Sequence, residues 1–317
     1  MALKTRLMTS RFSSWLPLAR LLRLPNVFTA QADILLTILI TLFVVEHHGD
    51  TSFVWRAILI YVASSFFYLG GMVWNDYFDQ KEDLIHRPFR PIPSGQIRSK
   101  TALRIALLLS SLGLFTVLII CNLKEEWDWS PLGIASGLLV AILLYNGLLK
   151  SYWIGPFIMA LCRFIHIFLG FSISIESVPF HIQFHLASII GLYILGITYF
   201  ARQEEQQSQS NSLRFAAGIV AFALIVALGF PLQQKLGESL SAFPYLLVGF
   251  GFYIGRPIFR AIQQPNPRFV QQAVKTSILG LIILDSILAT VFAGYYGLLL
   301  IVLLLPARQI GKWVYST

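Results

Sequence analysis

The sequence predicts an all-α membrane protein, with nine transmembrane helices in a single bundle. Three observations predict this class: 56% of the 317 residues are apolar, only 12% are charged, and the mean hydropathy is +0.70. A soluble domain would be about half apolar and about a quarter charged. Mostly apolar runs of the length that crosses a bilayer, about 20 residues, recur along the chain, and nothing in it suggests a separate soluble domain.

Each expected span is a mostly apolar run between polar connections. We expect the spans at 27–45, 54–74, 102–121, 131–149, 154–175, 185–201, 213–231, 241–259 and 276–304. The last run is long but too short for two full crossings, and 305–317 are expected to form a short tail. Over 11–24, arginine alternates with tryptophan and leucine, which indicates a helix lying at the membrane surface within the segment 1–26. We recognise no removable signal peptide.

Lysine and arginine predict the orientation of the bundle. Most of them fall in the N-terminal segment and in the connections 75–101, 202–212 and 260–275, which places these segments in the cytosol. The net charge of +9 is therefore explained by membrane orientation, and no nucleic-acid partner is expected. With nine spans the C-terminal end lies outside, so Arg308 and Lys312 are exceptions to the rule.

The densest charge follows the second span directly, in "WNDYFDQKEDLIHRPFRPIPSGQIRSK", residues 74–100. Asp76, Asp79 and Asp83 stand at i, i+3 and i+7, so on a helix they lie within about 60° of one another. A helical extension of the span would present three carboxylates on one face, and Asn75 adds a neutral oxygen. Because like charges repel, this density of oxygen ligands suits Mg²⁺, which shares its coordination shell with waters and substrate phosphates.

Three arginines follow the acidic residues. Arg87, Arg90 and Arg98 carry the planar fork of donors that suits phosphate oxygens. Carboxylates and cations beside an apolar cavity would bind a ligand with a diphosphate head and an apolar tail. The alternative is a solvated, charged loop that caps the end of a helix.

"NDYFDQKED" followed by "RPFRPIPSG" resembles the first signature of the UbiA superfamily of intramembrane prenyltransferases, N-D-x-x-D-x-x-x-D and then R-P-I/L-P-S-G. The seven-residue step from Asp83 to Arg90 is more similar to the chlorophyll synthase and archaeal-lipid branches than to the ubiquinone branch. Nine spans also agree with the family, so the resemblance covers most of the chain. It implies Mg²⁺-dependent transfer of an isoprenyl group from an isoprenyl diphosphate to a hydrophobic or aromatic acceptor in the membrane.

The resemblance also implies roles for single residues. Asn26 in "LRLPNVFTAQAD" would face the active cavity, and Lys150 in "LYNGLLKSYWIGP" would meet the diphosphate, unless it is a lone lysine of the positive-inside kind. Asp33 lies seven residues after Asn26 on the same helical face, as a functional residue or as a structural hydrogen-bonding group. In "CRFIHIFLG", Arg163 needs a partner or a watery cavity, and both pairing with His166 nearby and ligand contact stay open.

After the sixth span, where the family usually carries several aspartates, this chain has "TYFARQEEQQSQSN". Glu204 and Glu205 are adjacent and would point about 100° apart on a helix, so they cannot replace the paired ligands of the usual motif. Glu204 remains a candidate metal ligand and Arg202 a candidate phosphate ligand. Together with "CRFIHIFLG", this segment resembles a divergent EboC-like branch found in bacterial gene clusters.

Two further features belong to no motif. Asp285 in the last span is expected to make a buried polar contact. Aromatic residues such as Tyr68 and Tyr145 are candidates for the lining of a prenyl tunnel, where they would shield a carbocation, although most aromatic residues in such a protein pack or face lipid.

These observations lead to one main hypothesis and two alternatives. We expect a multi-pass prenyltransferase of the bacterial inner membrane, with catalytic residues Asp76, Asp79 and Lys150. The expected substrate-binding residues are Asn26, Asn75, Arg87, Arg90, Lys150, Arg163 and Arg202, and the expected Mg²⁺ ligands are Asp76, Asp79, Asp83 and Glu204. The altered second motif motivates the first alternative, a non-catalytic lipid-binding or transport component that keeps the fold. The second, a secondary transporter, would need paired broken helices at mid-membrane, and the sequence contains no convincing pair.

Overall fold

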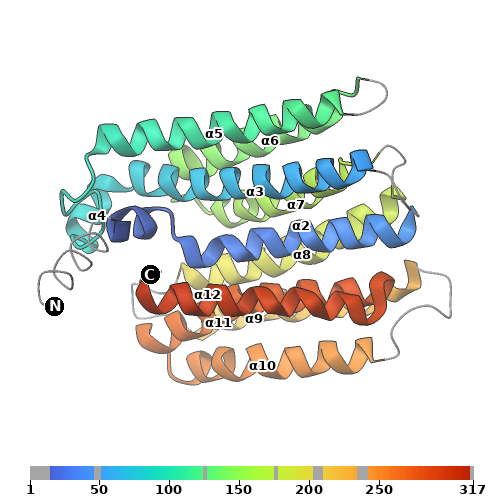
Figure 1. The fold of residues 1–317 in the computed structure, drawn as a ribbon. Coiled ribbons are helices and arrows are strands. Elements are labelled where there is room, and N and C mark those ends of the chain that lie inside the picture. Colours follow the sequence, from blue (N-terminus) through green and yellow to red (C-terminus); the bar gives the residue numbers. More distant parts are fainter. Residues whose placement is uncertain are drawn as a thin grey trace, which may run out of the picture.

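The computed structural model describes residues 15–45, 51–123, 127–174, 178–202, 210–233 and 242–314. These residues fold into helices alone, and most helices lie side by side along one axis (Figure 1). After a short helix over 15–21, the elements are α2 (Leu24–Val44), α3 (Thr51–Phe78), α4 (Gln80–His86), α5 (Ser99–Asn122), α6 (Ser130–Leu144), η1 (Tyr145–Leu149), α7 (Gly155–Phe171), α8 (Phe180–Ala201), α9 (Ser210–Leu228), η2 (Phe230–Gln233), α10 (Phe243–Gln263), α11 (Pro267–Ala293), η3 (Gly294–Leu303) and α12 (Leu304–Trp313).

The expected class of an all-α membrane protein is confirmed. Within the described ranges, seven helical segments are long and apolar enough to cross a membrane. Two of the nine expected spans are not among them. The fifth corresponds to α7, which has only 17 residues, and the eighth to α10, which carries Arg256, Pro257 and Arg260 near its end. Both helices nevertheless lie within the bundle (Figure 1).

The last apolar run folds as a hairpin rather than as one span with a short tail. α11 ends at Ala293, and the next residue, Gly294, has a φ of 53° and a ψ of −133°, which favour glycine. The chain then returns along α11 as η3 and α12 (Figure 1). At the reversal, the Ser286 hydroxyl donates a hydrogen bond to the carbonyl of Gly297 at 2.9 Å. The expected tail over 305–317 is therefore helical as far as Trp313.

The expectation of one span followed by a tail was wrong because it converted the number of residues into length with the rise of an α-helix. η3 is a 3₁₀ helix of 10 residues, and such a helix rises about 2.0 Å per residue instead of about 1.5 Å. η3 and α12 together are therefore long enough to form the second arm of the hairpin. Gly311 of α12 lies against Pro25 at the start of α2. This contact puts Arg308 and Lys312, which were expected outside, at the same end of the bundle as the other cation-rich segments.

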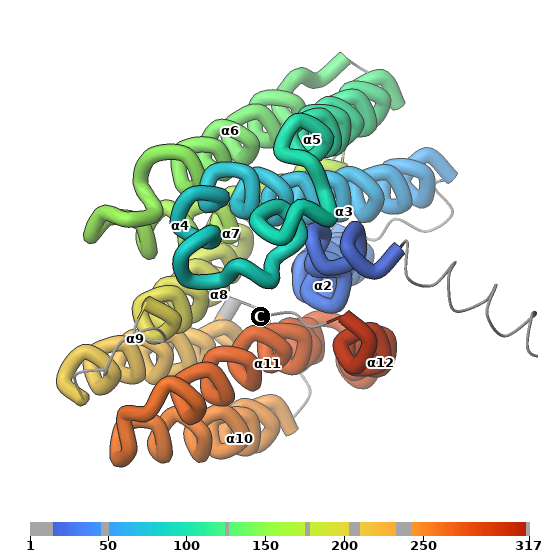
Figure 2. The backbone as a smooth tube through the Cα atoms, turned by 90° about the vertical axis from the view of Figure 1, so that its left-hand side faces the viewer, coloured from blue at the N-terminus to red at the C-terminus, as the bar shows by residue number. Residues whose placement is uncertain are grey.

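One end of the bundle carries the polar segments. Figure 2 looks along the bundle from this end and shows α4 and the connection to α5 lying across it. α2 is central, because it packs against α3, α7, α11 and α12. Side chains that point inward from α2 therefore meet residues from both halves of the chain, which is how segments far apart in the sequence come to form one site.

Close approach of α8 and α9 depends on a glycine, and we predict its effect on stability. A Cβ atom at Gly196 would lie 2.6 Å from Cγ2 of Val220 and 2.9 Å from its backbone nitrogen. Because this backbone cannot move aside freely, Gly196→Ala is expected to lower the free energy of unfolding by about 1–3 kcal/mol. Denaturant unfolding of the purified protein in detergent would measure this change.

Gly218 on α9 provides the matched control. A Cβ atom there meets nothing within 4 Å. Gly218→Ala should therefore leave stability unchanged or raise it by about 0.5–1 kcal/mol, the usual gain for alanine over glycine in a helix. Equal effects of the two substitutions would show that the α8–α9 contact is looser than described.

Candidate active site

A cavity of about 720 Å³ opens at the polar end of the bundle. Its lining has two parts. The charged and amide side chains are Arg23, Asn26, Asn75, Asp79, Glu82, Asp83, Arg87, Arg90, Asn146, Lys150, Arg163 and Arg202. The apolar part includes Ala30, Phe67, Leu138, Ile142, Ile194, Ile197, Ile278 and Leu281. The volume is in the range of small-molecule sites, about 300–1,000 Å³, and the lining suits a ligand with a charged head and an apolar tail.

The acidic motif forms the helical extension that its spacing predicts, with a break at Asp79. α3 ends at Phe78, and α4 starts at Gln80. The backbone hydrogen bonds continue across the break, from the amide of Asp79 to the carbonyl of Asn75 at 3.0 Å and from the amide of Asp83 to the carbonyl of Asp79 at 2.8 Å. The side chains of Asn75, Asp79 and Asp83 line the cavity, whereas Asp76, which was expected on the same face, is buried and is not among the lining residues.

The sequence "RPIPSG" forms a tight turn that directs Arg90 at the acidic residues. The backbone amide and the hydroxyl of Ser94 both donate to the carbonyl of Arg90, at 3.0 and 2.7 Å. Gly95 completes the turn with a φ of 74°, which favours glycine. Nη1 of Arg90 then lies 2.6 Å from Oδ2 of Asp83 and 3.6 Å from Oδ1 of Asp76. The turn thus places a buried guanidinium among the carboxylates.

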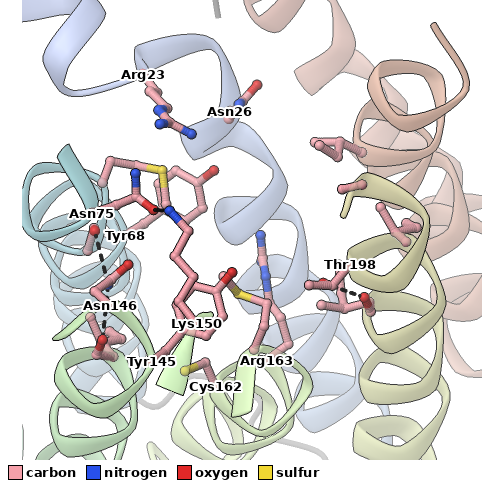
Figure 3. A pocket seen from close by; sticks show the side chains of 18 of the residues that line it. Arg23, Asn26, Tyr68, Asn75, Tyr145, Asn146, Lys150, Cys162, Arg163 and Thr198 are labelled. Carbon is pink, nitrogen blue, oxygen red and sulfur yellow. Dashed lines mark hydrogen bonds between the residues drawn. The ribbon is translucent and has the colours of Figure 1, made fainter. Parts of the chain in front are cut away.

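Lys150 is positioned by η1, a π-helical turn that precedes it. The amide of Lys150 donates to the carbonyl of Tyr145 at 2.9 Å. Gly147 lets this turn lie against the ring of Phe78. Nζ of Lys150 contacts Oδ2 of Asp79 and donates to Oδ1 of Asn75 at 3.0 Å (Figure 3). Single π-helical turns occur often at functional sites, and this one brings a cation from α6 to the acidic motif of α3.

The other predicted substrate-binding residues are placed differently. Nη2 of Arg202 donates to the carbonyls of Lys150 and Tyr152, so this guanidinium anchors the loop that carries Lys150. Asn26 and Arg87 line the cavity. Arg98, at the start of α5, is not among the residues that line it. Glu204 lies outside the described residues.

In the structure, the three aspartates gather around Nη1 of Arg90, and each of them is paired with a cation. Nη2 of Arg23 lies 2.9 Å from Oδ1 of Asp76, Arg90 binds Asp83, and Lys150 binds Asp79. Among the described residues, no three acidic, histidine or cysteine side chains converge into a group that could hold a metal ion by itself. Each of the three aspartates thus has a cation as its partner.

Two of the aspartates still fit a magnesium ion that shares its coordination with a substrate. The amide nitrogen of Asn75 donates to Oδ1 of Asp76 at 3.2 Å and to Oδ2 of Asp79 at 3.1 Å, so it joins the two carboxylates. Mg²⁺ is usually bound by one or two carboxylates together with substrate phosphates. Asp76 and Asp79 meet this requirement. Asp83 is engaged with Arg90, and its role as a metal ligand stays a prediction.

Burial shifts the pKa values of two side chains at the cavity mouth, Asp83 and Arg90. It raises the pKa of Asp83 above its ordinary value against the opposing effect of Arg90, and the nearby Asp79 and Asp76 raise it further. Burial, together with the charge of Arg23, also lowers the pKa of Arg90, although Asp76 and Asp83 oppose the change. Ionisable side chains whose pKa values are shifted by burial and by charged neighbours are typical of functional sites.

A second polar cluster lies deeper, between α2 and α7. Nη1 of Arg163 binds Oδ2 of Asp33, and Nη2 donates to Oγ1 of Thr29 at 2.9 Å. Nδ1 of His166 lies 3.1 Å from the same Asp33 oxygen, and its Nε2 lies 2.8 Å from Oγ of Ser64. Arg163 thus has the partner that a charge inside a span requires, and it also lines the cavity and extends toward α2 (Figure 3).

Sequence reasoning missed Arg23 as a site residue. It appeared only as one of many cations near the N-terminus, yet it pairs with Asp76 and lines the cavity. Among the described residues, it is the only one other than glycine with a positive φ, at 46°. Such backbone conformations cost energy and cluster at functional sites. No local sequence pattern around Arg23 indicated this conformation.

Comparison with known proteins agrees with this geometry. The family model of the UbiA prenyltransferase family matches residues 34–273. The digeranylgeranylglyceryl phosphate synthase of Methanobrevibacter smithii is 39% identical over 94 residues, which are 30% of this chain and 32% of that protein. The synthase of Sulfolobus acidocaldarius is 34% identical over 104 residues, 32% of this chain and 34% of that protein. The chain therefore matches about a third of the length of these curated relatives.

Solved structures show the same fold over nearly the whole chain. A digeranylgeranylglyceryl phosphate synthase structure has a TM-score of 0.62 at 22% identity and covers 88% of this chain and 99% of that one. A UbiA homolog from Archaeoglobus fulgidus bound to GPP and Mg²⁺ has a TM-score of 0.61 at 13% identity, covering 90% and 99%. With the family match over most of the sequence, the chain belongs to the UbiA prenyltransferase family, a family of prenyl-group transferases, and is a multi-pass integral membrane protein.

Proposed function

We propose that the protein transfers an isoprenyl group from an isoprenyl diphosphate to an acceptor within the membrane, with Mg²⁺ as cofactor. The observation that carries this proposal is one cavity with carboxylates and cations at its mouth and an apolar interior. The Archaeoglobus homolog that binds GPP and Mg²⁺ supports the donor class and the metal. The names of the curated relatives favour an acceptor with a glyceryl phosphate group.

The residues at the mouth have separate roles in this proposal. Asp76 and Asp79 would hold Mg²⁺, and Asn75 keeps both carboxylates in place. Lys150 and Arg90 bind oxygens of the diphosphate. As the allylic carbon–oxygen bond breaks, its electron pair leaves with the diphosphate, and the cations stabilise the charge that develops there. The acceptor forms the new bond to that carbon and loses its proton. When bound, Mg²⁺ supplies further positive charge for the leaving group.

We also propose the finer topology and location. The single membrane domain would lie in the bacterial inner membrane, with eight single spans from α2 to α10 followed by the hairpin of α11, η3 and α12 in place of the expected ninth span. The cavity mouth would face the cytosol, because cations gather at this end and the hairpin adds Arg308 and Lys312 to them. The curated relatives reported above are archaeal synthases, which supports the archaeal-lipid branch. They do not support the EboC-like assignment, which rests only on "CRFIHIFLG" and "YFARQEE".

A lipid-binding protein without turnover is the second candidate function. One observation favours it: each aspartate at the mouth is already paired with a cation. The experiment that separates the two functions follows a labelled isoprenyl group from its diphosphate into cell lipid extract. Mg²⁺-dependent labelling of a lipid product supports the transferase, and saturable donor binding without any product supports the lipid-binding protein.

Lys150 gives a test of donor binding. Lys150→Gln is expected to raise the KM for the isoprenyl diphosphate about 10–100-fold, because a charge-assisted hydrogen bond contributes about 1.5–3 kcal/mol. Initial rates of diphosphate release over a range of donor concentrations would measure it. Lys100→Gln is the control, since Lys100 is exposed at the start of α5 and outside the cavity lining. An unchanged KM in the Lys150 variant would remove this residue from the donor site.

A further inference from the structure

The deeper polar cluster lies beyond the place where a diphosphate would bind. Asn26, Thr29 and Asp33 follow one another along one face of α2, at i, i+3 and i+7. Arg163 binds Thr29 and Asp33, so its guanidinium lies about 5–10 Å deeper than Asn26 at the helical rise of about 1.5 Å per residue. Lys150 and Arg163 line the same cavity, so a donor whose diphosphate is held at Lys150 would share that cavity with a molecule bound at Arg163.

The guanidinium of Arg163 has donors beyond those that its two hydrogen bonds to α2 use. An arginine carries five N–H donors, and the bonds to Asp33 and Thr29 use two of them. The side chain is 13% exposed and lines the cavity, and its guanidinium lies 5.5 Å from the ring centre of Tyr68. The guanidinium is therefore anchored on α2, and the side chain that carries it borders the cavity that an acceptor would enter.

The charge of this cluster is already balanced. Asp285 of α11 lies against Asp33, and both side chains are fully buried. Both oxygens of Asp285 and Oδ1 of Asp33 lack a hydrogen-bond donor among the described residues. Two adjacent carboxylates without donors repel, whereas one carboxylic acid bonded to one carboxylate satisfies both groups. With Asp285 as the neutral acid, the charge of Asp33 balances that of Arg163.

We propose that Arg163 binds and positions the acceptor by donating a hydrogen bond to an uncharged oxygen, a hydroxyl or a carbonyl. Asp285 acts as a positioning residue, because its acid proton holds Asp33, and Asp33 holds Arg163. An anionic group at Arg163 would leave an unbalanced negative charge inside the membrane, which is costly. The proposal rests on the proposed function and deepens it, because it assigns a site to an uncharged oxygen of the acceptor, such as a glyceryl hydroxyl, and keeps any phosphate group of the acceptor away from Arg163.

Paired variants separate this role from folding. Arg163→Lys keeps the charge opposite Asp33 but loses the planar fork of donors. The double variant Asp33→Asn/Arg163→Gln removes both charges together, so it leaves neither unpaired. Asp285→Asn replaces the acid proton with an amide donor and should restore the hydrogen bond to Asp33, whereas Asp285→Val cannot form it.

The experiment measures equilibrium binding of three probes to the full chain purified in detergent. The probes are 1-O-octadecylglycerol, which is neutral, stearate, which is anionic, and inorganic diphosphate with Mg²⁺, which reports on the mouth. Octadecylglycerol is expected to bind about 10–100-fold more weakly to Arg163→Lys and to the double variant, the usual effect of a lost bond to a charged group. Asp285→Asn should bind it like the wild type, and Asp285→Val more weakly. Diphosphate binding should stay unchanged in all variants.

Three results would overturn the inference. The first is binding of octadecylglycerol that does not depend on Arg163. The second is binding of stearate that depends on Arg163 and is tighter than binding of octadecylglycerol. The third is an equal loss of octadecylglycerol binding and diphosphate binding in Arg163→Lys. The last result would show a merely structural role. Failure of the proposed function is a separate outcome, because it appears as a wild-type protein that binds octadecylglycerol but not diphosphate with Mg²⁺.

Discussion

Asp79→Asn is expected to lower Mg²⁺-dependent diphosphate release by about 10²–10³-fold while the protein still inserts into the membrane. A decrease of this size is typical when an enzyme loses one preorganised group that stabilises charge in the transition state. Asparagine keeps the shape of the side chain but not its charge, so both a metal ligand and the partner of Lys150 are lost. Release of diphosphate by equal amounts of membrane-inserted protein would measure the effect.

Asp128→Asn is the control for this prediction. Asp128 precedes α6 and accepts hydrogen bonds from the backbone amide and the hydroxyl of Ser130, outside the cavity. Its substitution removes the same charge from the same type of side chain and should leave the rate unchanged. If the Asp79 variant released diphosphate as fast as this control, Asp79 would have no part in the reaction.

Arg163→Gln is expected to lower the free energy of unfolding by about 3–5 kcal/mol, because removing one partner of a buried ion pair leaves the other charge without compensation. The affected charge is that of Asp33, which is fully buried on α2. Asp33→Asn/Arg163→Gln removes both charges and should cost less than the single substitution. Denaturant unfolding of the wild type, both single variants and the double variant forms a double-mutant cycle that measures the coupling.

A coupling energy near zero in this cycle would contradict the ion pair. Gln183 on α8 offers a comparison, since its side-chain amide donates to a backbone carbonyl, that of Val178. Gln183→Ala should cost about 0.5–1.5 kcal/mol, the usual net contribution of a neutral hydrogen bond. The difference between the two losses separates the effect of a buried charge from that of an ordinary polar contact.

Local spacing predicted a large part of the fold and of the site. Composition gave the all-α membrane class, and the i, i+3, i+7 spacing of the aspartates predicted a helical extension that the structure contains. The position of Asp33 on the same face as Asn26 was also predictable, because helical periodicity needs no tertiary information. The assignment of chemical roles to these residues remains a proposal.

Features that depend on tertiary structure were not predictable. Arg23 pairs with Asp76 over a separation of 53 residues, and Lys150 pairs with Asp79 over 71. Neither partner follows from spacing along one helix, so the pairing of the carboxylates with cations was missed. The C-terminal hairpin was missed for a different reason, because a long 3₁₀ helix is uncommon and the span was counted with α-helical rise.

Diphosphate release from a panel of isoprenyl diphosphates tests the central claim most directly. The purified protein in lipid would be assayed with and without Mg²⁺, with cell lipid extract as acceptor source and Asp76→Asn/Asp79→Asn as the inactive control. The account predicts release that requires Mg²⁺, prefers one donor and is lost in the control variant. Saturable Mg²⁺-dependent binding of the same donors without any release would contradict it and favour the lipid-binding protein.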